Sequence, residues 1–188
     1  MPPTPAAPLP AGTTPTAAGP LPPGLEARPP VPADADALRG LVAACDRSYL
    51  DWAPAGWTPP ADWSARLGEP GRWSLGVFAG EDLVAYASFR PARHEPAPGA
   101  ATGPPLPGLA HVAALYVHPA QWRQGIGTAM LARAEAEMRT RGYDSARLWT
   151  PEGAPAERFY AAHGWRRDGQ SGWDGWLGLQ MVGYAKRL

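Results

Sequence analysis

Hydrophobic residues recur with the spacing of an α-helix in several segments of the chain. Between residues 34 and 50 they repeat at intervals of three and four and form one apolar face; they are Leu38, Leu41, Val42, Cys45 and Tyr49. The same spacing predicts helices over residues 127–141 and 155–163, which end at Gly142 and Gly164. Residues 59–67 begin with two prolines, which a first helical turn tolerates, and they predict a second, shorter helix.

Runs of β-branched and aromatic residues lie between these helices and predict strands. Residues 73–79 and 83–90 flank the turn sequence Gly80-Glu81-Asp82 and predict a hairpin. Residues 111–117 are apolar on both faces, as expected of a strand in the middle of a sheet. The remaining predicted strands are residues 146–150, 165–168 and 177–186. The elements therefore follow the order ααββ, βαβα, ββ.

This order predicts the fold class. The strand, helix and strand of residues 111–150 require a parallel pair joined by a right-handed crossover, whereas the hairpins on either side are antiparallel. A chain of 188 residues is long enough for one domain with a substantial core. We therefore expect a single α+β (α/β) domain with a mixed, mostly antiparallel sheet, a central parallel pair and helices on both faces.

Proline-rich stretches interrupt the pattern twice. Of the 25 prolines, 12 lie within residues 1–32, where they exclude regular helix and sheet. We expect residues 1–31 to be a disordered tail and residues 32–188 to form the domain. Residues 91–109 contain six prolines and no hydrophobic periodicity, so they predict a long surface loop. Such a loop either covers a substrate site or is decoration.

Charge and residue composition argue against several classes of function. The 17 basic and 17 acidic residues cancel, which gives no overall attraction to nucleic acid or to an anionic membrane. No stretch approaches the roughly 20 apolar residues that span a bilayer, and the first residues lack the pattern of a signal peptide, so we expect a cytoplasmic protein. The single cysteine, Cys45, lies among apolar helix positions, which favours core packing over a nucleophile. The four histidines lack metal-ligand spacing, so no metal site is predicted.

The chemically informative segment joins the strand that ends near Val117 to the helix that begins near Gly127. Two glycines stand at the helix entrance, where the first amides have no partner within the helix and the helix dipole favours negative charge. A phosphate or pyrophosphate suits this position, and Arg123 and Thr128 are placed to add to its binding. A dinucleotide fingerprint is excluded because Met130 replaces its third glycine, and a P-loop is excluded because Gly-Lys-Ser/Thr is absent.

Three elements in sequence resemble the GNAT superfamily of acetyl-CoA-dependent N-acetyltransferases. They are the strand Leu115-Tyr116-Val117, the loop Gln124-Gly125-Ile126-Gly127 and the segment Phe159-Tyr160-Ala161-Ala162-His163-Gly164-Trp165. The resemblance covers residues 31–188 and implies acetyl-CoA as co-substrate. It also implies that the strand splays from its parallel neighbour and pairs with the pantetheine arm, while loop amides hold the pyrophosphate. The implied cofactor-binding residues are Leu115, Tyr116, Val117, Arg123, Gln124, Gly125, Ile126, Gly127 and Thr128.

The sequence departs from the family pattern at two positions. Trp122 stands where the family often has Gln or Arg, three residues before the first glycine, and Gly153 stands where it often has Asn. Neither change removes a backbone donor, so we expect them to affect side-chain contacts to the cofactor more than the fold.

The resemblance also assigns catalytic roles. It implies that Tyr160 protonates the thiolate of CoA; the alternative is a tyrosine that is only part of the core. A backbone amide on the strand of residues 115–117 is expected to stabilise the oxyanion, because a bulged strand leaves an N–H without a partner. His111 stands where a basic glutamate is often found, and it is either the general base or a structural residue. His118, beside the loop, is expected to be a turn residue or cap.

The implied function is transfer of an acetyl group from acetyl-CoA to a primary amine by direct attack. The amine is a small molecule, an amino acid or a peptide amino group, and no nucleic acid or membrane partner is expected. Two alternatives stay open: a non-catalytic acyl-CoA-binding regulatory module, and a nucleotide-binding protein that uses the loop for a diphosphate. We expect the first two helices, the loop of residues 91–109 and the region of residues 171–176 to select the acceptor. Related enzymes are often dimers, which makes a homodimer an open expectation.

Overall fold

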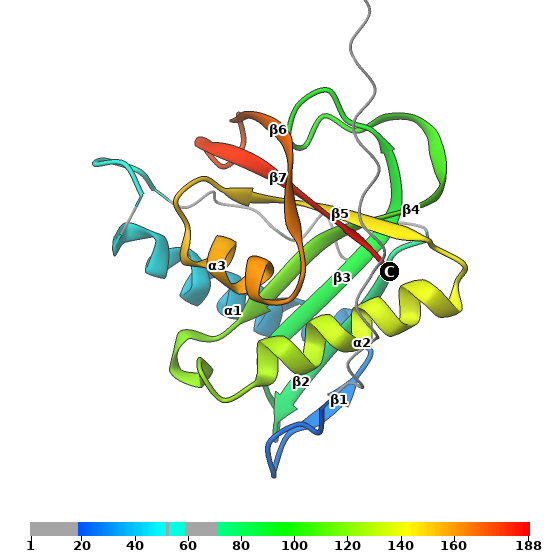
Figure 1. Ribbon diagram of the computed structural model, residues 1–188. Coiled ribbons are helices and arrows are strands. Elements are labelled where there is room, and N and C mark those ends of the chain that lie inside the picture. Colours follow the sequence, from blue (N-terminus) through cyan, green and yellow to red (C-terminus); the bar gives the residue numbers. More distant parts are fainter. Residues whose placement is uncertain (1–18, 52, 59–70) are drawn as a thin grey trace, which may run out of the picture.

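A mixed sheet of seven strands forms the centre of the protein (Figure 1). The computed structural model describes residues 19–51, 53–58 and 71–188, and its strands lie in the order β1-β2-β3-β4-β5-β7-β6. Their bounds are β1 Glu26–Arg28, β2 Trp73–Ala79, β3 Asp82–His94, β4 Thr102–Val117, β5 Ser145–Pro151, β6 Arg166–Asp174 and β7 Leu179–Arg187. Within the described ranges only β4 and β5 run parallel, which confirms the predicted sheet.

Helices cover both faces of the sheet, as predicted. Helix α1 (Ala35–Arg47) packs its apolar face against one side, where Leu41 lies in a cluster with Tyr86 of β3. Helix α2 (Ile126–Thr140) packs against the opposite side, where Met130 lies in a cluster with Ala85 and Ala87. Adjacent residues of a strand point to opposite faces, so these contacts place α1 and α2 on different sides. Helix α3 (Pro155–Ala162) lies on the side of α2 (Figure 1).

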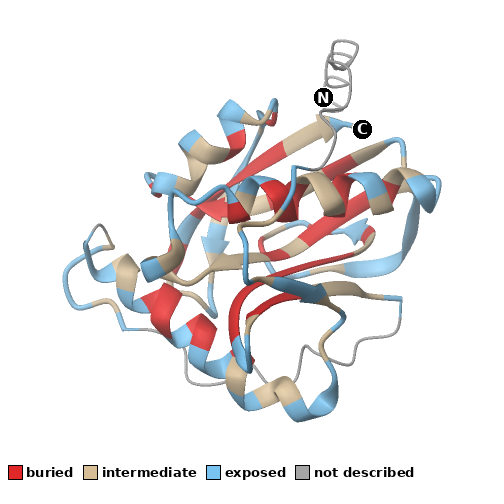
Figure 2. Cartoon of the chain, turned by 90° about the horizontal axis from the view of Figure 1, so that it is seen from below, coloured by how far each residue is buried: buried red, intermediate tan, exposed pale blue. Residues whose placement is uncertain are grey.

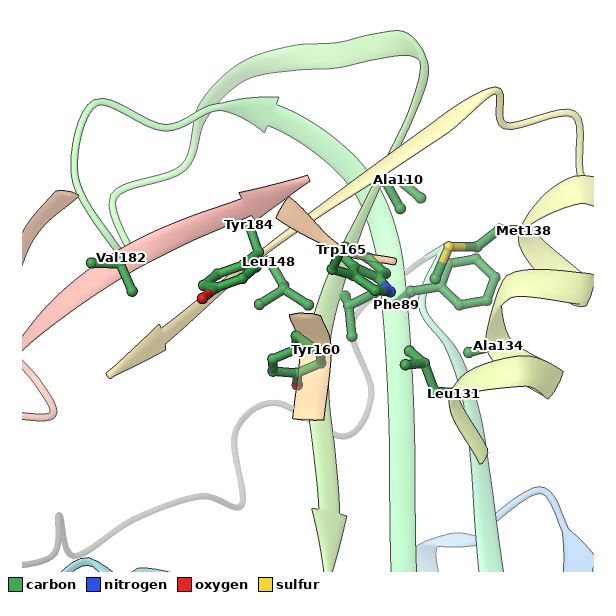
Figure 3. Packing of buried hydrophobic residues seen from close by; sticks show 12 residues of the cluster. Phe89, Ala110, Leu131, Ala134, Met138, Leu148, Tyr160, Trp165, Val182 and Tyr184 are labelled. Carbon is green, nitrogen blue, oxygen red and sulfur yellow. The ribbon is translucent and has the colours of Figure 1, made fainter. Parts of the chain in front are cut away.

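The largest buried cluster joins α2 and α3 to the second half of the sheet. Figure 3 shows the rings of Tyr160, Trp165 and Tyr184 gathered near Leu148. Figure 2 shows the same distribution for the whole chain, with buried residues along the central strands and on the helices that cover them. The core therefore holds α3, which carries Tyr160, firmly against β5 and β7.

A buried ion pair fixes α2 relative to this cluster. The carboxylate of Glu135 on α2 accepts a hydrogen bond from the indole of Trp165, with Nε1 and Oε1 3.0 Å apart. The same carboxylate binds the ammonium of Lys186 on β7, at 2.7 Å. Since Trp165 lies shortly after the end of α3, this network ties α2 to the helix that carries Tyr160.

The structure differs from the sequence prediction at the N-terminal side. Residues 26–28, expected to belong to the tail, form β1 and pair antiparallel with β2. The guanidinium of Arg28 lies 3.6 Å from the ring centroid of Phe78 and binds Asp34, which explains why this segment joins the sheet. Hydrogen bonds from Arg28 and from the backbone of Val31 lower the pKa of Asp34 to about 2. The predicted helix of residues 59–67 lies outside the described residues.

The segment of residues 91–109 is also different from the predicted loop. β3 continues to His94 and β4 begins at Thr102, so only a turn separates them. The pairing there is irregular, with register shifts around Arg93. Prolines are tolerated because this part of β4 pairs only with β3 among the described strands, which leaves its other edge unpaired. No helix in the described part of the chain is long and apolar enough to cross a membrane.

Candidate active site

The site is built on a break in the sheet between β4 and β5. The two strands pair only where Leu109, Ala110 and His111 lie opposite residues 145–147. Beyond this point β4 continues alongside β3 to Val117, while β5 continues alongside β7 to Pro151. The predicted splay of the parallel pair is therefore present, and it opens on the side of the α2 entrance.

Backbone groups of β4 face this gap. The N–H of His118 donates to the carbonyl of Val84 at 2.8 Å. Every second residue of a strand directs its backbone N–H and C=O to the same neighbour, so Tyr116 also directs these groups toward β3. Leu115 and Val117 direct theirs to the other side, toward the gap. Two of the three predicted strand residues thus direct their backbone toward the gap, and the third pairs with β3.

A β-bulge lies just before these residues. Ser88 pairs with Ala114 and Phe89 with Val112, which leaves Ala113 as the extra residue in β4. We expected a bulge within residues 115–117, and the structure places it two positions earlier. Ala113 borders the cavity described below, so the irregular backbone lies in its wall.

The loop between β4 and α2 is open to solvent. Its two turning residues, Arg123 and Gly125, have left-handed φ angles of 65° and 80°, and residues 122–125 are exposed. α2 begins at Ile126, and the amides of Ile126, Gly127 and Thr128 have no hydrogen-bond acceptor among the described residues. A Cβ added to Gly125 would meet no atom within 4 Å. The turn therefore leaves these three amides open to solvent, which is the arrangement that the predicted phosphate site requires.

Side chains around the loop tie it to α3 and β4. The Oγ1 of Thr128 lies 3.0 Å from Nε2 of His163, whose Nδ1 lies 2.8 Å from the carbonyl oxygen of Phe159. His163 was not among the predicted site residues, and its only signal in the sequence was its place in the motif that carries Tyr160. The ring of His118 accepts a hydrogen bond from the amide of Ala120 at the start of the 3-10 turn Pro119–Gln121, which confirms the predicted cap.

The departure at Trp122 has a structural role. Its indole N–H donates to the carbonyl oxygen of Val117 at 2.7 Å, although about half of the side chain is exposed. The thiol of Cys45 on α1 donates to the same oxygen at 3.3 Å. The end of β4 is thus held by the loop on one side and by α1 on the other.

A cavity of about 180 Å³ lies at the splay. Tyr160 reaches it from α3, His111 and Ala113 border it from β4, and Trp149 borders it from β5. Tyr160 is 8% exposed, and its burial raises the pKa of its phenol. The structure therefore brings the predicted acid, Tyr160, and the predicted base, His111, into one cavity. The bulge of β4 at Ala113 forms part of the wall of this cavity.

Residues from the predicted acceptor regions border the same cavity. Asp174 and Trp176 come from the end of β6 and the turn after it, as expected, whereas Trp173 is exposed outside the cavity. Tyr49 follows α1 and stacks near Trp57 with ring centroids 5.6 Å apart. Trp57 is one of three tryptophans between residues 52 and 63, and the other two, Trp52 and Trp63, lie outside the described residues.

Sequence reasoning missed a buried carboxylate in this cavity. Glu95 follows β3 in the segment that was expected to be a loop, and it is only 4% exposed. Its carboxylate binds Arg147 of β5 at 3.1 Å and accepts a hydrogen bond from the amide of Gly99 at 3.0 Å. The only signal was an acidic residue between prolines.

In the described part of the chain, no group of three or more His, Cys, Asp or Glu residues is arranged to hold a metal.

Comparison with known proteins identifies the family. Residues 42–165 match the family model of the Acetyltransferase (GNAT) family, and the chain therefore belongs to this family of acetyltransferases. No curated protein matches the sequence significantly.

Solved structures show the same fold at low identity. PaiA N-acetyltransferase from Thermoplasma acidophilum, in complex with coenzyme A, has a TM-score of 0.61 at 17% identity and covers 87% of this chain and 99% of its own. YncA of Salmonella typhimurium, solved with its cofactor acetyl-CoA, has a TM-score of 0.61 at 20% identity and covers 88% and 94%. An acetyltransferase from Thermus thermophilus has a TM-score of 0.60 at 23% identity and covers 87% and 97%.

The burial of Cys45 predicts that its thiol reacts slowly in the folded protein. Burial raises the pKa of its thiol to about 12, so the reactive thiolate is absent at pH 8. We expect a thiol reagent at pH 8 to modify less than about a tenth of the native protein in the time that the urea-unfolded chain reacts completely. Because the chain has one cysteine, the readout is unambiguous. Stoichiometric reaction of the native protein at pH 8 would contradict the core assignment.

Proposed function

We propose that the protein is an N-acetyltransferase that moves the acetyl group of acetyl-CoA to a primary amine. The observation that carries the proposal is the open set of amides at the entrance of α2, beside a strand gap that leads to a cavity containing Tyr160. A diphosphate fits the amides and the helix dipole, and an extended arm fits the gap as a further strand would. Membership of the family supports the same donor.

The residues that would hold acetyl-CoA fall into two groups. Leu115 and Val117 face the gap with their backbone and would pair with the pantetheine arm, while Tyr116 supports them from the β3 side. The loop would hold the pyrophosphate through the amides of residues 124–128 and the charge of Arg123. Thr128 contributes its amide, because its hydroxyl already contacts His163.

The reaction requires three things of the cavity: a neutral amine, stabilisation of the oxyanion and a proton for the thiolate. The amine nitrogen attacks the thioester carbonyl carbon, and the C–S bond breaks as the amide forms. His111 accepts the proton released by nitrogen, and Tyr160 donates one to sulfur, so that one proton moves from nitrogen to sulfur in net terms. A backbone amide beside the bulge at Ala113 is the proposed donor to the oxyanion.

The phenol of Tyr160 suits the role of acid. Since burial raises its pKa, it stays protonated throughout the neutral range. It gives up its proton only to a strong base, and the thiolate released from CoA is such a base where burial disfavours its negative charge.

The acceptor is a small amine or the end of a peptide. The cavity volume suits a small group, and Asp174 and Trp176 at its border suit an ammonium ion before it loses its proton. A cytoplasmic location and a homodimer stay predictions from the sequence.

A thiol-release assay tests the proposal. The protein is mixed with acetyl-CoA and a panel of small amines, amino acids and peptides, and free thiol is followed. We expect amine-dependent release for at least one acceptor class. Heat of CoA binding without release for any amine would favour the non-catalytic acyl-CoA-binding module, and displacement of CoA by ATP would favour a nucleotide site.

Replacing Gly125 with Ala tests the pyrophosphate site. The substitution places a methyl group in the open space before the amides and strains a left-handed residue, so we expect the Kd for CoA to rise about tenfold or more. Gly142→Ala is the matched control, because Gly142 ends the same helix with φ of 81° and equally open surroundings. Calorimetry with CoA compares the two variants, and equal affinities would contradict the site.

Replacing Tyr160 with Phe tests the acid. We expect kcat to fall by about 100-fold, within the range for a general acid, while the affinity for acetyl-CoA changes little. Tyr184→Phe is the control: its hydroxyl binds Glu157 at 2.8 Å outside the cavity, so turnover should stay unchanged. Steady-state kinetics with the best acceptor of the panel measures both. Unaltered kcat in Tyr160→Phe would remove the phenol from the mechanism.

A further inference from the structure

Three basic side chains form a row across the sheet at the narrow end of the splay. Arg90 of β3 lies opposite His111 of β4, and His111 lies opposite Arg147 of β5. Residues directly opposite one another in neighbouring strands place their side chains on the same face. The imidazole of His111 is therefore flanked by a guanidinium on each side.

The carboxylate of Glu95 lies over this row and contacts all three members. Its oxygens are 3.1 Å from Arg147 Nη2, 3.6 Å from His111 Nδ1 and 3.9 Å from Arg90 Nη2. The amide of Gly99 fixes the carboxylate further, at 3.0 Å. Glu95 and His111 are 4% and 6% exposed, so water screens these charges weakly.

The position of Glu95 is determined by the turn between β3 and β4. This turn lies beside β6 (Figure 1), where Pro98 is so close to Gly172 that an added Cβ would come within 2.8 Å. The turn therefore brings the carboxylate of the residue that follows β3 onto the face of the sheet that carries His111. A shorter hairpin would not bring this carboxylate to the row of three basic groups.

Electrostatics indicates what the carboxylate does for His111. Two neighbouring guanidiniums oppose a positive charge on the imidazole, and a neighbouring carboxylate favours it. The carboxylate also favours placing the proton of the neutral ring on Nδ1, which faces it, and this leaves Nε2 as the basic nitrogen. Among the described residues, the other titratable or charged side chains that border the same cavity are Tyr49, Arg72, Tyr86, Tyr116, Tyr160 and Asp174.

We propose that Glu95 is a positioning residue that orients His111 and stabilises its protonated form when His111 takes the proton of the acceptor amine. The inference rests on the proposed function, in which His111 is the general base. Glu95 acts through His111 and does not itself take the proton, since its oxygens are already engaged by Arg147 and Gly99.

Glu95→Gln tests this role through two independent readouts. Without the carboxylate, the flanking guanidiniums oppose protonation of His111. We expect kcat to fall about tenfold to 100-fold and the acid limb of the pH–rate profile to move to lower pH. We also expect the NMR titration of the His111 ring to move to lower pH in the same variant. Glu95→Asp keeps the charge and should recover part of both effects.

Two comparisons separate this role from a structural one. In the His111→Asn background, where the base is absent, Glu95→Gln should cause no further loss of kcat. Glu137→Gln removes a carboxylate from the exposed pair with Arg141 and should change neither readout. Calorimetry with CoA verifies that each variant retains a folded cofactor site.

The outcomes distinguish the inference from the proposed function. An unmoved His111 titration in both Glu95 variants, or an equal loss of kcat with and without His111, overturns the role of Glu95. Absence of turnover by the unmodified protein with every amine overturns the proposed function. The NMR titration still reports in that case whether Glu95 controls the protonation of His111.

Discussion

The early end of pairing between β4 and β5 is the constraint on which the rest of the site depends. Backbone N–H and C=O groups in the middle of a sheet are almost always paired, because burying them without a partner is costly. Here Leu115 and Val117 turn those groups into a gap inside the sheet, where β5 has moved away to follow β7. The gap is an edge within the sheet, and an extended ligand satisfies an edge in the same way that a strand does.

The elements around this edge also contribute the residues of the site. The bulge at Ala113 bends β4 at the point where pairing with β5 has stopped. α3 covers the gap and brings Tyr160 to the cavity, and Glu135 ties α2 to Trp165, which lies shortly after the end of α3. The core thus holds the open amides at the entrance of α2 and the cavity beside the same gap in the sheet.

The sequence predicted those parts of the site whose geometry is local. Helical periodicity, alternating strands and two glycines before a helix are short-range patterns, so the fold class and the loop could be derived from them, and Tyr160 was named from the family resemblance of its motif. Glu95 could not, because its burial depends on irregular pairing between β3 and β4 and on the contact of Pro98 with β6. β1 was missed for a similar reason: it is held by Arg28 on Phe78, a contact that no local pattern reveals.

Trp122 shows how a departure from a family pattern changes the chemistry of the edge. The carbonyl oxygen of Val117 accepts from the indole of Trp122 and from the thiol of Cys45, and a carbonyl oxygen has two lone pairs. Both are engaged, so this oxygen has little capacity left for a ligand in the gap. The groups that still face it are the amide of Val117 and both backbone groups of Leu115. A ligand arm that pairs here must therefore place an acceptor opposite the amide of Val117. Its first donor can pair only with the carbonyl oxygen of Leu115, two residues earlier in β4. This requirement restricts how the arm aligns with the strand.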